Sequence, residues 1–380
     1  MIKYLRYFSH RLRQIQEIVD RQEQDARLLR ELAERQMRIE TQLATLPELT
    51  ACQIALQEQL GALQAQLRQN QGEQLGELAA VQATTGETLA RLNTATEQNQ
   101  DTQHLLRQAL GRVELRQTET KPEWIDQAVR VYSQFGEDGF LAYLLRQITP
   151  SRRFFVEFGV EDYREANTLW LLEHAKWAGL VLDGSEENIA ALRSRRTYER
   201  NDLQAEAAFI TRENINALLT QYGATGELGV LSIDIDGNDY WVWEALEAVT
   251  ADIVILEYNF RFGPDAAVVV PYDPSFVKHE AHPTALYYGA SLGALTQLGK
   301  RKGYDLVGCS EGGANAFFVR REKRPVSVPV RTPQEAFVYG THDEWRELQP
   351  DGGYRLRKAS FAEQHALVMS LPLTTLETPQ

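Results

Sequence analysis

The chain has 380 residues, which is enough for two or three domains and for at least one full-sized hydrophobic core. Its net charge of −13 argues against a nucleic-acid partner, because phosphate binding requires a basic surface. The absence of an apolar stretch of about 18 residues argues against a membrane span. Two cysteines, Cys52 and Cys309, lie in regions of different character, so we expect a reducing compartment, the cytoplasm, and no disulfide framework.

The first residues, MIKYLRYFSHRLRQI, mix aromatic and aliphatic side chains with basic ones and lack the continuous apolar core of a secretory signal. One interpretation is a helix that lies on an anionic membrane surface, which would place the protein at the inner face of the membrane. The other is the start of a long helix with a solvated basic face. Both interpretations predict a helix here.

Residues 1–117 are rich in Gln, Glu, Arg, Leu and Ala, and their apolar positions recur at three- and four-residue steps, as in Leu56, Leu60, Leu63 and Leu67. This period is typical of a coiled coil. Pro47 interrupts it, so we expect two or three helical segments. An exposed leucine seam needs burial, which favours a homo-oligomer; a helical hairpin that folds on itself is the alternative.

From residue 124 onwards, apolar runs alternate with segments of helical spacing. The runs predict five strands, at 154–160, 179–185, 205–211, 229–236 and 252–259. The intervening segments predict four helices. The first covers 166–179 and ends at Gly179, the second follows Ser185, the third follows Thr211, and the fourth begins at residue 240. Near-continuous apolar strands separated by helices indicate a parallel sheet covered on both faces.

An irregular segment follows at 260–289, then a helix that Ser291 caps and Gly303 ends. Two further strands, DLVGC and NAFFVR, are separated by only five residues and must therefore be antiparallel. We thus predict an α/β, Rossmann-like domain over 124–322 with a seven-stranded, mostly parallel sheet and an antiparallel last strand. Residues 323–380 form a polar C-terminal extension to which the sequence assigns no role.

Ligands of open parallel sheets bind at the carboxyl ends of the strands. The first strand ends in Glu157 and is followed by Gly159, which permits a tight turn and a close approach of a ligand. The second strand ends in Asp183, where an acid typically accepts hydrogen bonds from ribose hydroxyls.

Several motifs resemble the FkbM-type family of class I S-adenosylmethionine-dependent methyltransferases over about residues 130–320. They are SQFGEDGFL (133–141), VEFGVEDYREANT (156–168), LDGSEENI (182–189), LSIDIDGNDYW (231–241), LEYN (256–259) and the terminal hairpin. The resemblance implies S-adenosylmethionine as cofactor and the following contacts with it: Gln134 and Glu137 from a covering helix, Glu157 and Gly159 at the methionine part, Asp183 with Gly184 at the ribose, and Ile210 at the adenine. SQFGED also fits a helix start that Ser133 caps, without any role in binding.

The stretch SIDIDGNDYW places Asp234 and Asp236 on one side of the expected fourth strand, and Asp239 at the start of the next helix. With Glu257 at the end of the fifth strand, four carboxylates would converge, which suits Mg²⁺ or Mn²⁺. The metal-free alternative makes Asp236 or His282 the general base. A calcium-binding loop is excluded, because Asp239 occupies the position that requires glycine.

These features favour an O-methyltransferase that acts on a sugar hydroxyl of a surface glycan or of a glycosylated metabolite, with a saccharide substrate and a membrane or glycan-assembly partner. The first alternative is a metal-dependent nucleotide-sugar glycosyltransferase that uses Asp234 and Asp236. The second is a non-catalytic coiled-coil scaffold that carries a degenerate cofactor-binding domain.

Overall fold

The computed structural model describes residues 111–119, 121, 123–340, 344–349 and 353–376, together with the isolated positions 51, 55, 58, 59, 106 and 109. The chain divides into two compact units, residues 1–113 and 114–380. The basic N-terminal segment and nearly all of the predicted coiled coil lie outside the described residues, although residues 111–117 are helical.

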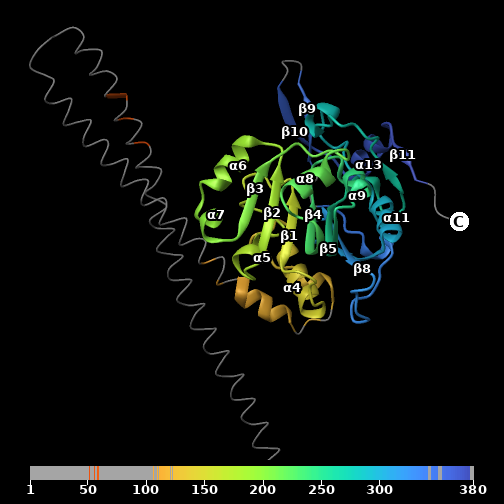
Figure 1. Cartoon of the computed structure of the whole chain (residues 1–380). Coiled ribbons are helices and arrows are strands. Elements are labelled where there is room, and N and C mark those ends of the chain that lie inside the picture. The colour runs from red at the N-terminus through yellow and green to blue at the C-terminus, as the bar shows by residue number, and fades with distance from the viewer. Residues whose placement is uncertain are drawn as a thin grey trace, which may run out of the picture. The chain divides into compact units, whose positions relative to one another are not determined.

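The second unit is built on a seven-stranded sheet with the order β3-β2-β1-β4-β5-β8-β7 (Figure 1). Its strands are β1 (Phe154–Phe158), β2 (Ala178–Asp183), β3 (Leu203–Ala207), β4 (Gly226–Ile233), β5 (Val249–Glu257), β7 (Tyr304–Cys309) and β8 (Asn315–Arg320). Strands β1 to β5 pair in parallel, and β8 lies antiparallel between β5 and β7. The predicted Rossmann-like, mostly parallel sheet with an antiparallel last strand is confirmed.

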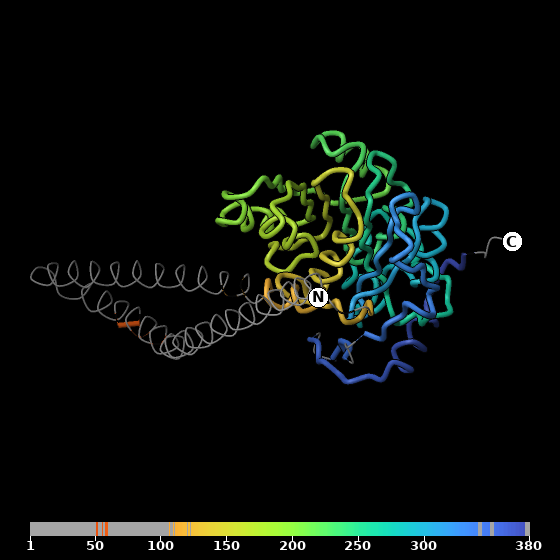
Figure 2. The backbone as a smooth tube through the Cα atoms, turned by 90° about the horizontal axis from the view of Figure 1, so that it is seen from below, coloured from red at the N-terminus to blue at the C-terminus, as the bar shows by residue number. Residues whose placement is uncertain are grey.

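Helices cover both faces of this sheet, because successive strand residues point to opposite sides. On one face Val156 and Phe158 pack with α8, α9 and α11, and on the other Phe155 packs with α4, α5 and α6. The bounds of these helices are α4 Glu137–Gln147, α5 Leu169–Glu173, α6 Glu186–Arg193, α8 Ile215–Gln221, α9 Asp239–Ala245 and α11 Leu292–Lys302. Figure 2 traces the backbone of this unit, with α4 in yellow and the segments after β8 in blue.

Several predicted helix ends are confirmed. The hydroxyl of Ser185 accepts the backbone N–H of Asn188 at the start of α6, and Ser291 does the same for α11. Gly303 follows α11 with φ 85°, a left-handed conformation that favours glycine. A short helix, α7 (Arg196–Arg200), extends the segment after α6.

Other boundaries differ from the prediction. Helix α5 ends at Glu173, and Gly179 lies inside β2, where a Cβ atom would stand 2.2 Å from the ring of Phe155. Asn214 rather than Thr211 precedes α8, and its backbone N–H donates to the hydroxyl of Thr211 at 3.3 Å. Strand β3 lies earlier than predicted, so residues 208–211 form a loop.

The most consequential difference concerns β4, which ends at Ile233. Asp234 and Asp236 therefore lie in the turn that follows the strand, and the backbone of Asp236 is left-handed, with φ 58°. Strand alternation cannot bring their side chains to one side, as the sequence analysis supposed. The turn does so instead.

The segments after β5 and after β8 pack on the sheet domain. They contain η2 (Phe260–Phe262), β6 (Val268–Val269), α10 (Lys278–Ala281), α12 (Pro333–Ala336), β9 (Glu344–Leu348), β10 (Tyr354–Lys358), α13 (Phe361–Met369) and β11 (Thr374–Thr375). Strand β11 pairs with β6, and Val368 of α13 packs with Phe262. Most of 323–376 is therefore part of the same compact unit. No helix among the described residues is long and apolar enough to cross a bilayer.

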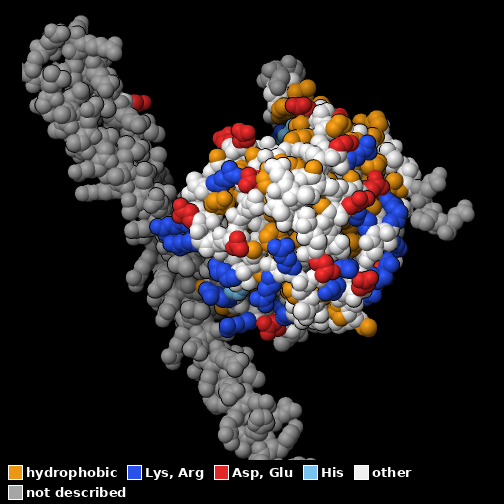
Figure 3. All heavy atoms as spheres, viewed as in Figure 1, with side chains coloured by type: hydrophobic (Ala, Val, Ile, Leu, Met, Phe, Trp, Pro, Cys, Tyr) orange, Lys and Arg blue, Asp and Glu red, His pale blue; other side chains and the backbone are white. Residues whose placement is uncertain are grey.

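The β9–β10 hairpin stands out from this unit and carries apolar side chains on its surface (Figure 3). Leu348, Tyr354 and Leu356 are 51%, 55% and 65% exposed. Trp345 and Leu356 of the hairpin also line the cavity described next.

Candidate functional site

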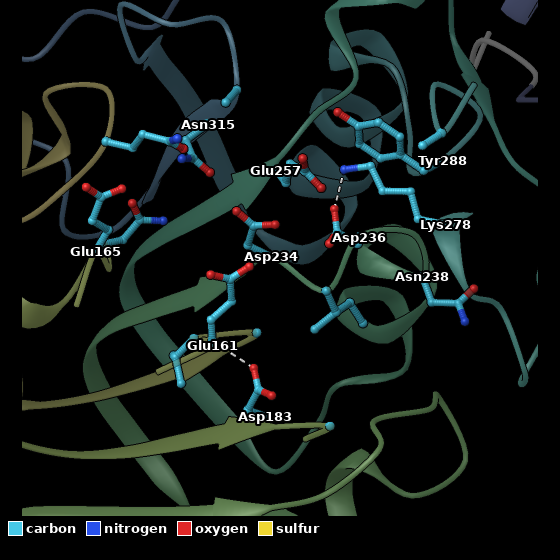
Figure 4. Close-up of a pocket in the computed structure, with 18 of the residues that line it drawn as sticks. Glu161, Glu165, Asp183, Asp234, Asp236, Asn238, Glu257, Lys278, Tyr288 and Asn315 are labelled. Atoms are coloured by element: carbon cyan, nitrogen blue, oxygen red, sulfur yellow. Dashed lines mark hydrogen bonds and ion pairs between the residues drawn. The ribbon is translucent and has the colours of Figure 1, made fainter. Parts of the chain in front are cut away.

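A cavity of about 790 Å³ opens at the carboxyl ends of β1, β2, β4 and β5. The strand order reverses between β1 and β4, and an open α/β sheet binds its ligands at such a switch point. Figure 4 shows the side chains that enter the cavity from these strand ends and from the later loops.

Most of the predicted cofactor residues line this cavity: Gln134, Glu157, Gly159, Asp183, Gly184 and Ile210. Glu137 does not line it. Its fully buried carboxylate accepts the backbone N–H of Phe135 at 2.8 Å and the side-chain N–H of Asn315 at 2.9 Å. Because Asn315 does line the cavity, Glu137 supports the wall without reaching the ligand space.

The SQFGED motif forms a tightly bonded helix start. One carboxylate oxygen of Asp138 accepts three backbone N–H groups, from Val131, Tyr132 and Ser133, at 2.7–2.9 Å. The Ser133 hydroxyl in turn accepts the N–H of Asp138. Burial raises the pKa of Asp138 to about 7. The prediction that Ser133 caps the helix is wrong, because Gly136, with φ 84°, precedes α4 and no side chain caps it. Gln134 and Phe135 of the motif line the cavity.

At Gly159 the loop that follows β1 comes into close contact with the loop that follows β4. Its φ is 74°, and a Cβ atom there would lie 1.6 Å from the carbonyl oxygen of Asp234. The close approach that this glycine permits is thus to the protein's own backbone. Glu157 is also committed internally, since its carboxylate accepts the backbone N–H groups of Asn167 and Thr168 at the start of α5. Burial raises the pKa of Glu157.

Asp183 ends β2 with its carboxylate at the cavity wall. One oxygen accepts the N–H of Glu161 at 2.8 Å, and the other accepts the N–H of Ser185 at 2.9 Å. The side-chain N–H of Asn188 also donates to the second oxygen, at 3.3 Å. These bonds fix the carboxylate, and the first oxygen retains a further lone pair for a ligand. Phe209 lies close to Gly184 and is 51% exposed, so it offers an aromatic surface beside Asp183.

The carboxylates of Asp234, Asp236 and Glu257 converge, with one oxygen of each within 4.8 Å of the others (Figure 4). Burial, followed by the charge of Glu257, raises the pKa of Asp234 well above its ordinary value. Burial raises the pKa of Glu257 to about 8, and one oxygen of its carboxylate is buried without a hydrogen-bond partner. These three residues form what we call the acid cluster.

Asp239, the fourth predicted metal ligand, does not belong to the acid cluster. It is fully buried and accepts the backbone N–H groups of Ile235 and Gly237 at 2.8 and 2.9 Å. Burial raises its pKa to about 6. Asp239 therefore shapes the turn that carries Asp234 and Asp236.

A lysine approaches the acid cluster. The ammonium of Lys278, at the start of α10, contacts the carboxylate of Asp236 and lies 3.9 Å from the centroid of the Tyr288 ring. Burial alone would lower the pKa of Lys278, but the charges of Glu257 and Asp236 outweigh it and raise that pKa above its ordinary value. The cluster thus holds one fixed positive charge against three carboxyl groups.

His282, a predicted general base, is not brought to the cavity. Its ring nitrogen Nδ1 is 2.8 Å from the hydroxyl of Thr284, and Thr284 rather than His282 lines the cavity. Burial lowers the pKa of His282. A bond within its own loop therefore holds this imidazole away from the acid cluster.

The cavity residues that the sequence did not indicate include Arg261, Lys278 and Tyr288. Arg261 lies two residues after LEYN, a strand end that the sequence does indicate. Lys278 and Tyr288 lie in the long irregular segment after that strand, and such loops often carry functional residues. Their position was a signal, but no spacing linked them to the aspartates.

No protein-family profile matches the chain, and no curated protein is significantly similar to it. Among solved structures, the N-terminal domain of EvdMO1 with SAH bound is 12% identical, with a TM-score of 0.34, over 56% of this chain and 94% of that one. An O-methyltransferase from Bacillus cereus in complex with SAH is 13% identical, with a TM-score of 0.33, over 54% and 87%. The SAH-bound Podospora anserina methyltransferase PaMTH1 is 13% identical, with a TM-score of 0.33, over 55% and 86%. Similarities this low decide neither fold nor activity by themselves.

Proposed function

We propose that this protein is an S-adenosylmethionine-dependent O-methyltransferase that acts on a sugar hydroxyl. The proposal rests on one observation: a single cavity has two walls whose residues differ in chemistry. One wall, with Gly159 and Asp183, follows β1 and β2, and the other, with the acid cluster, follows β4 and β5. A cofactor and an acceptor could thus meet in one space.

The first wall fits the cofactor. Asp183 presents a fixed carboxylate for the ribose, and the exposed ring of Phe209 with Ile210 offers a surface for a base. The acidic side chains Glu161 and Glu165 also line the cavity and favour a cation. When bound, S-adenosylmethionine supplies an electrophilic methyl group on a positively charged sulfur.

The second wall fits the acceptor. Asp236 is the most exposed member of the acid cluster, with 59% of its side chain accessible, and Lys278 holds its carboxylate in place. We propose that Asp236 takes the proton of the sugar hydroxyl as the oxygen–methyl bond forms and the carbon–sulfur bond breaks. Glu257, which also lines the cavity, would accept a hydrogen bond from a second hydroxyl.

The acid cluster is also where we propose that Mg²⁺ or Mn²⁺ binds if a metal takes part. Three carboxylates suit a hard cation, and one buried oxygen of Glu257 lacks a partner. Since Lys278 already supplies one positive charge, a divalent ion would compete with its ammonium.

The cavity lining speaks against a nucleotide-sugar glycosyltransferase. Among the described residues eight acids and three bases line it, so the several negative charges of a diphosphate would need a metal as well as the basic side chains, whereas a single anionic group needs only one of them. The coiled coil of the scaffold alternative lies outside the described residues.

Calorimetric titration of the full chain tests the proposal. We expect S-adenosylhomocysteine to bind and UDP-glucose not to bind. The Asp183→Asn variant should weaken the first affinity about tenfold, because hydrogen bonds to a charged group are lost. Asp202→Asn is the matched control, since Asp202 is exposed and immediately precedes β3 at its amino end. Binding of UDP-glucose but not of S-adenosylhomocysteine would reject the proposal in favour of the glycosyltransferase.

The setting of the enzyme is part of the same proposal. We propose a cytoplasmic protein whose coiled coil holds several catalytic units together, near the inner membrane face or beside a partner in glycan assembly. Size-exclusion chromatography with light scattering, with and without residues 1–113, tests the oligomer.

A further inference from the structure

Arg261 occupies an unusual position in the cavity. It belongs to η2, directly after β5, and is 5% exposed although it lines the cavity. Its Nε donates to the side-chain oxygen of Gln364 on α13 at 2.6 Å, and its guanidinium stacks 4.4 Å from the centroid of the Phe260 ring. These contacts fix the plane of the guanidinium.

The two terminal nitrogens of this guanidinium have neither a hydrogen-bond partner nor a carboxylate partner among the described residues. They are also not sealed from solvent, as buried unpartnered atoms would be. A buried arginine stays charged and is almost always paired. The two terminal nitrogens of Arg261 therefore face the cavity without a counter-ion among the described residues.

The basic side chains that line the cavity among the described residues, Arg261, Lys278 and Arg346, all come from segments after β5, the side on which the acid cluster also lies. Lys278 is bound to Asp236. Arg346 is exposed on β9 and lies 3.3 Å from the Nδ1 of His279, a contact that brings no negative charge. Of the two arginines without a carboxylate partner among the described residues, Arg261 is the buried one.

We propose that Arg261 binds an anionic group of the acceptor, a carboxylate or a phosphate, and so selects an acidic sugar. This inference rests on the proposed function and deepens it. The two terminal nitrogens of a planar guanidinium match the two oxygens of such a group. The cofactor's own carboxylate is the poorer match, because β1 and β4 separate the Asp183 subsite from the end of β5.

The test is a calorimetric titration of the full chain, saturated with S-adenosylhomocysteine, with three probes: glucuronate, glucose 6-phosphate and glucose. We expect wild type to bind one of the two anions at least about tenfold more tightly than glucose. A preference for glucuronate identifies a carboxylate, and a preference for glucose 6-phosphate identifies a phosphate. The Arg261→Met variant should lose this preference, while Arg261→Lys keeps part of it, because lysine retains the charge but not the fork.

Two controls separate recognition from folding. Gln364→Leu removes the same hydrogen bond to Nε but leaves the guanidinium, so it should keep the anion preference. Arg301→Met removes an exposed arginine that is paired with Glu244 outside the cavity, and should change nothing. If Gln364→Leu loses the preference as fully as Arg261→Met, the role of Arg261 is structural and the inference fails.

Two other outcomes overturn the inference. One is a wild type that binds none of the probes, or binds glucose as tightly as the anions. The other is an Arg261→Met variant that weakens S-adenosylhomocysteine while the anion preference stays, which would assign Arg261 to the cofactor. Failure of wild type to bind S-adenosylhomocysteine would instead reject the proposed function, so the two failures are distinguishable.

Discussion

The ammonium of Lys278 lies against the carboxylate of Asp236, which is 42 residues earlier in the chain. Asp236 follows β4, and Lys278 comes from α10 in the long segment after β5. The pair places a fixed positive charge beside carboxyl groups that would otherwise repel one another. The chain thus supplies a cation of its own at a cluster whose residue types suit a metal.

Removal of this ammonium should make the acid cluster dependent on another cation. We expect Lys278→Met to bind Mn²⁺ at least about tenfold more tightly than wild type does, because the competing charge is gone. Wild-type activity should persist in EDTA. Mn²⁺ titration followed by electron paramagnetic resonance checks the affinity, with Lys302→Met as a control outside the cavity. An equal Mn²⁺ affinity of both proteins would contradict competition.

The raised pKa of Glu257 predicts a pH-dependent stability. The folded protein keeps the Glu257 proton up to about pH 8, whereas the unfolded chain releases it near 4.5. Between these values the native state binds more protons, so the free energy of unfolding falls as pH rises. Glu257→Gln should flatten this fall by about 1 kcal/mol or more between roughly pH 5 and 8.

Urea unfolding at several pH values measures this dependence. Glu199→Gln, an exposed acid on α7, is the matched control and should keep the wild-type profile. A Glu257→Gln profile parallel to that of wild type would show that Glu257 is ionised in the native protein.

Two glycines with nearly the same backbone conformation allow the cost of backbone strain to be measured separately from the cost of a steric clash. Gly159 and Gly223 have φ of 74° and 72°, but a Cβ atom meets the Asp234 carbonyl at 1.6 Å in the first case and nothing within 4 Å in the second. Gly223→Ala should lower the free energy of unfolding by about 1 kcal/mol. Gly159→Ala should lower it by at least about 3 kcal/mol, because the loop with the acid cluster must also move.

Calorimetric binding of S-adenosylhomocysteine completes this comparison. Gly159→Ala should bind it weakly or not at all, and Gly223→Ala should bind it as wild type does. Similar behaviour of the two variants would show that the β1 and β4 loops need not approach each other.

Asp138 holds a buried turn by three hydrogen bonds to one oxygen. Asp138→Ala leaves three buried N–H groups without an acceptor and should cost about 3 kcal/mol or more in urea unfolding. Asp138→Asn retains an acceptor oxygen and should cost clearly less. If both variants were equally destabilised, the charge of Asp138 rather than its hydrogen bonds would hold the turn.

Local patterns predicted much of the candidate site. Strand ends mark the ligand side of a parallel sheet, and this rule brought Gly159, Asp183, Asp234, Asp236 and Glu257 to one cavity. The prediction that Asp239 joins these residues was wrong, since an aspartate at a turn can use both oxygens to accept backbone N–H groups. The prediction for His282 was wrong because a neighbouring hydroxyl captures the ring nitrogen. Neither bond has a signature in residue spacing.

The sequence by itself determined the sheet, its antiparallel last strand and the edge at which the cavity lies, because periodicity, caps and connection length act over short distances along the chain. Tertiary structure alone decided that Lys278 meets Asp236, that Arg261 has no counter-ion among the described residues, and that the C-terminal hairpin lines the cavity. Those contacts join segments that are far apart in the sequence. Their partners are chosen by how the loops after β5 and β8 pack, and no local rule encodes that choice.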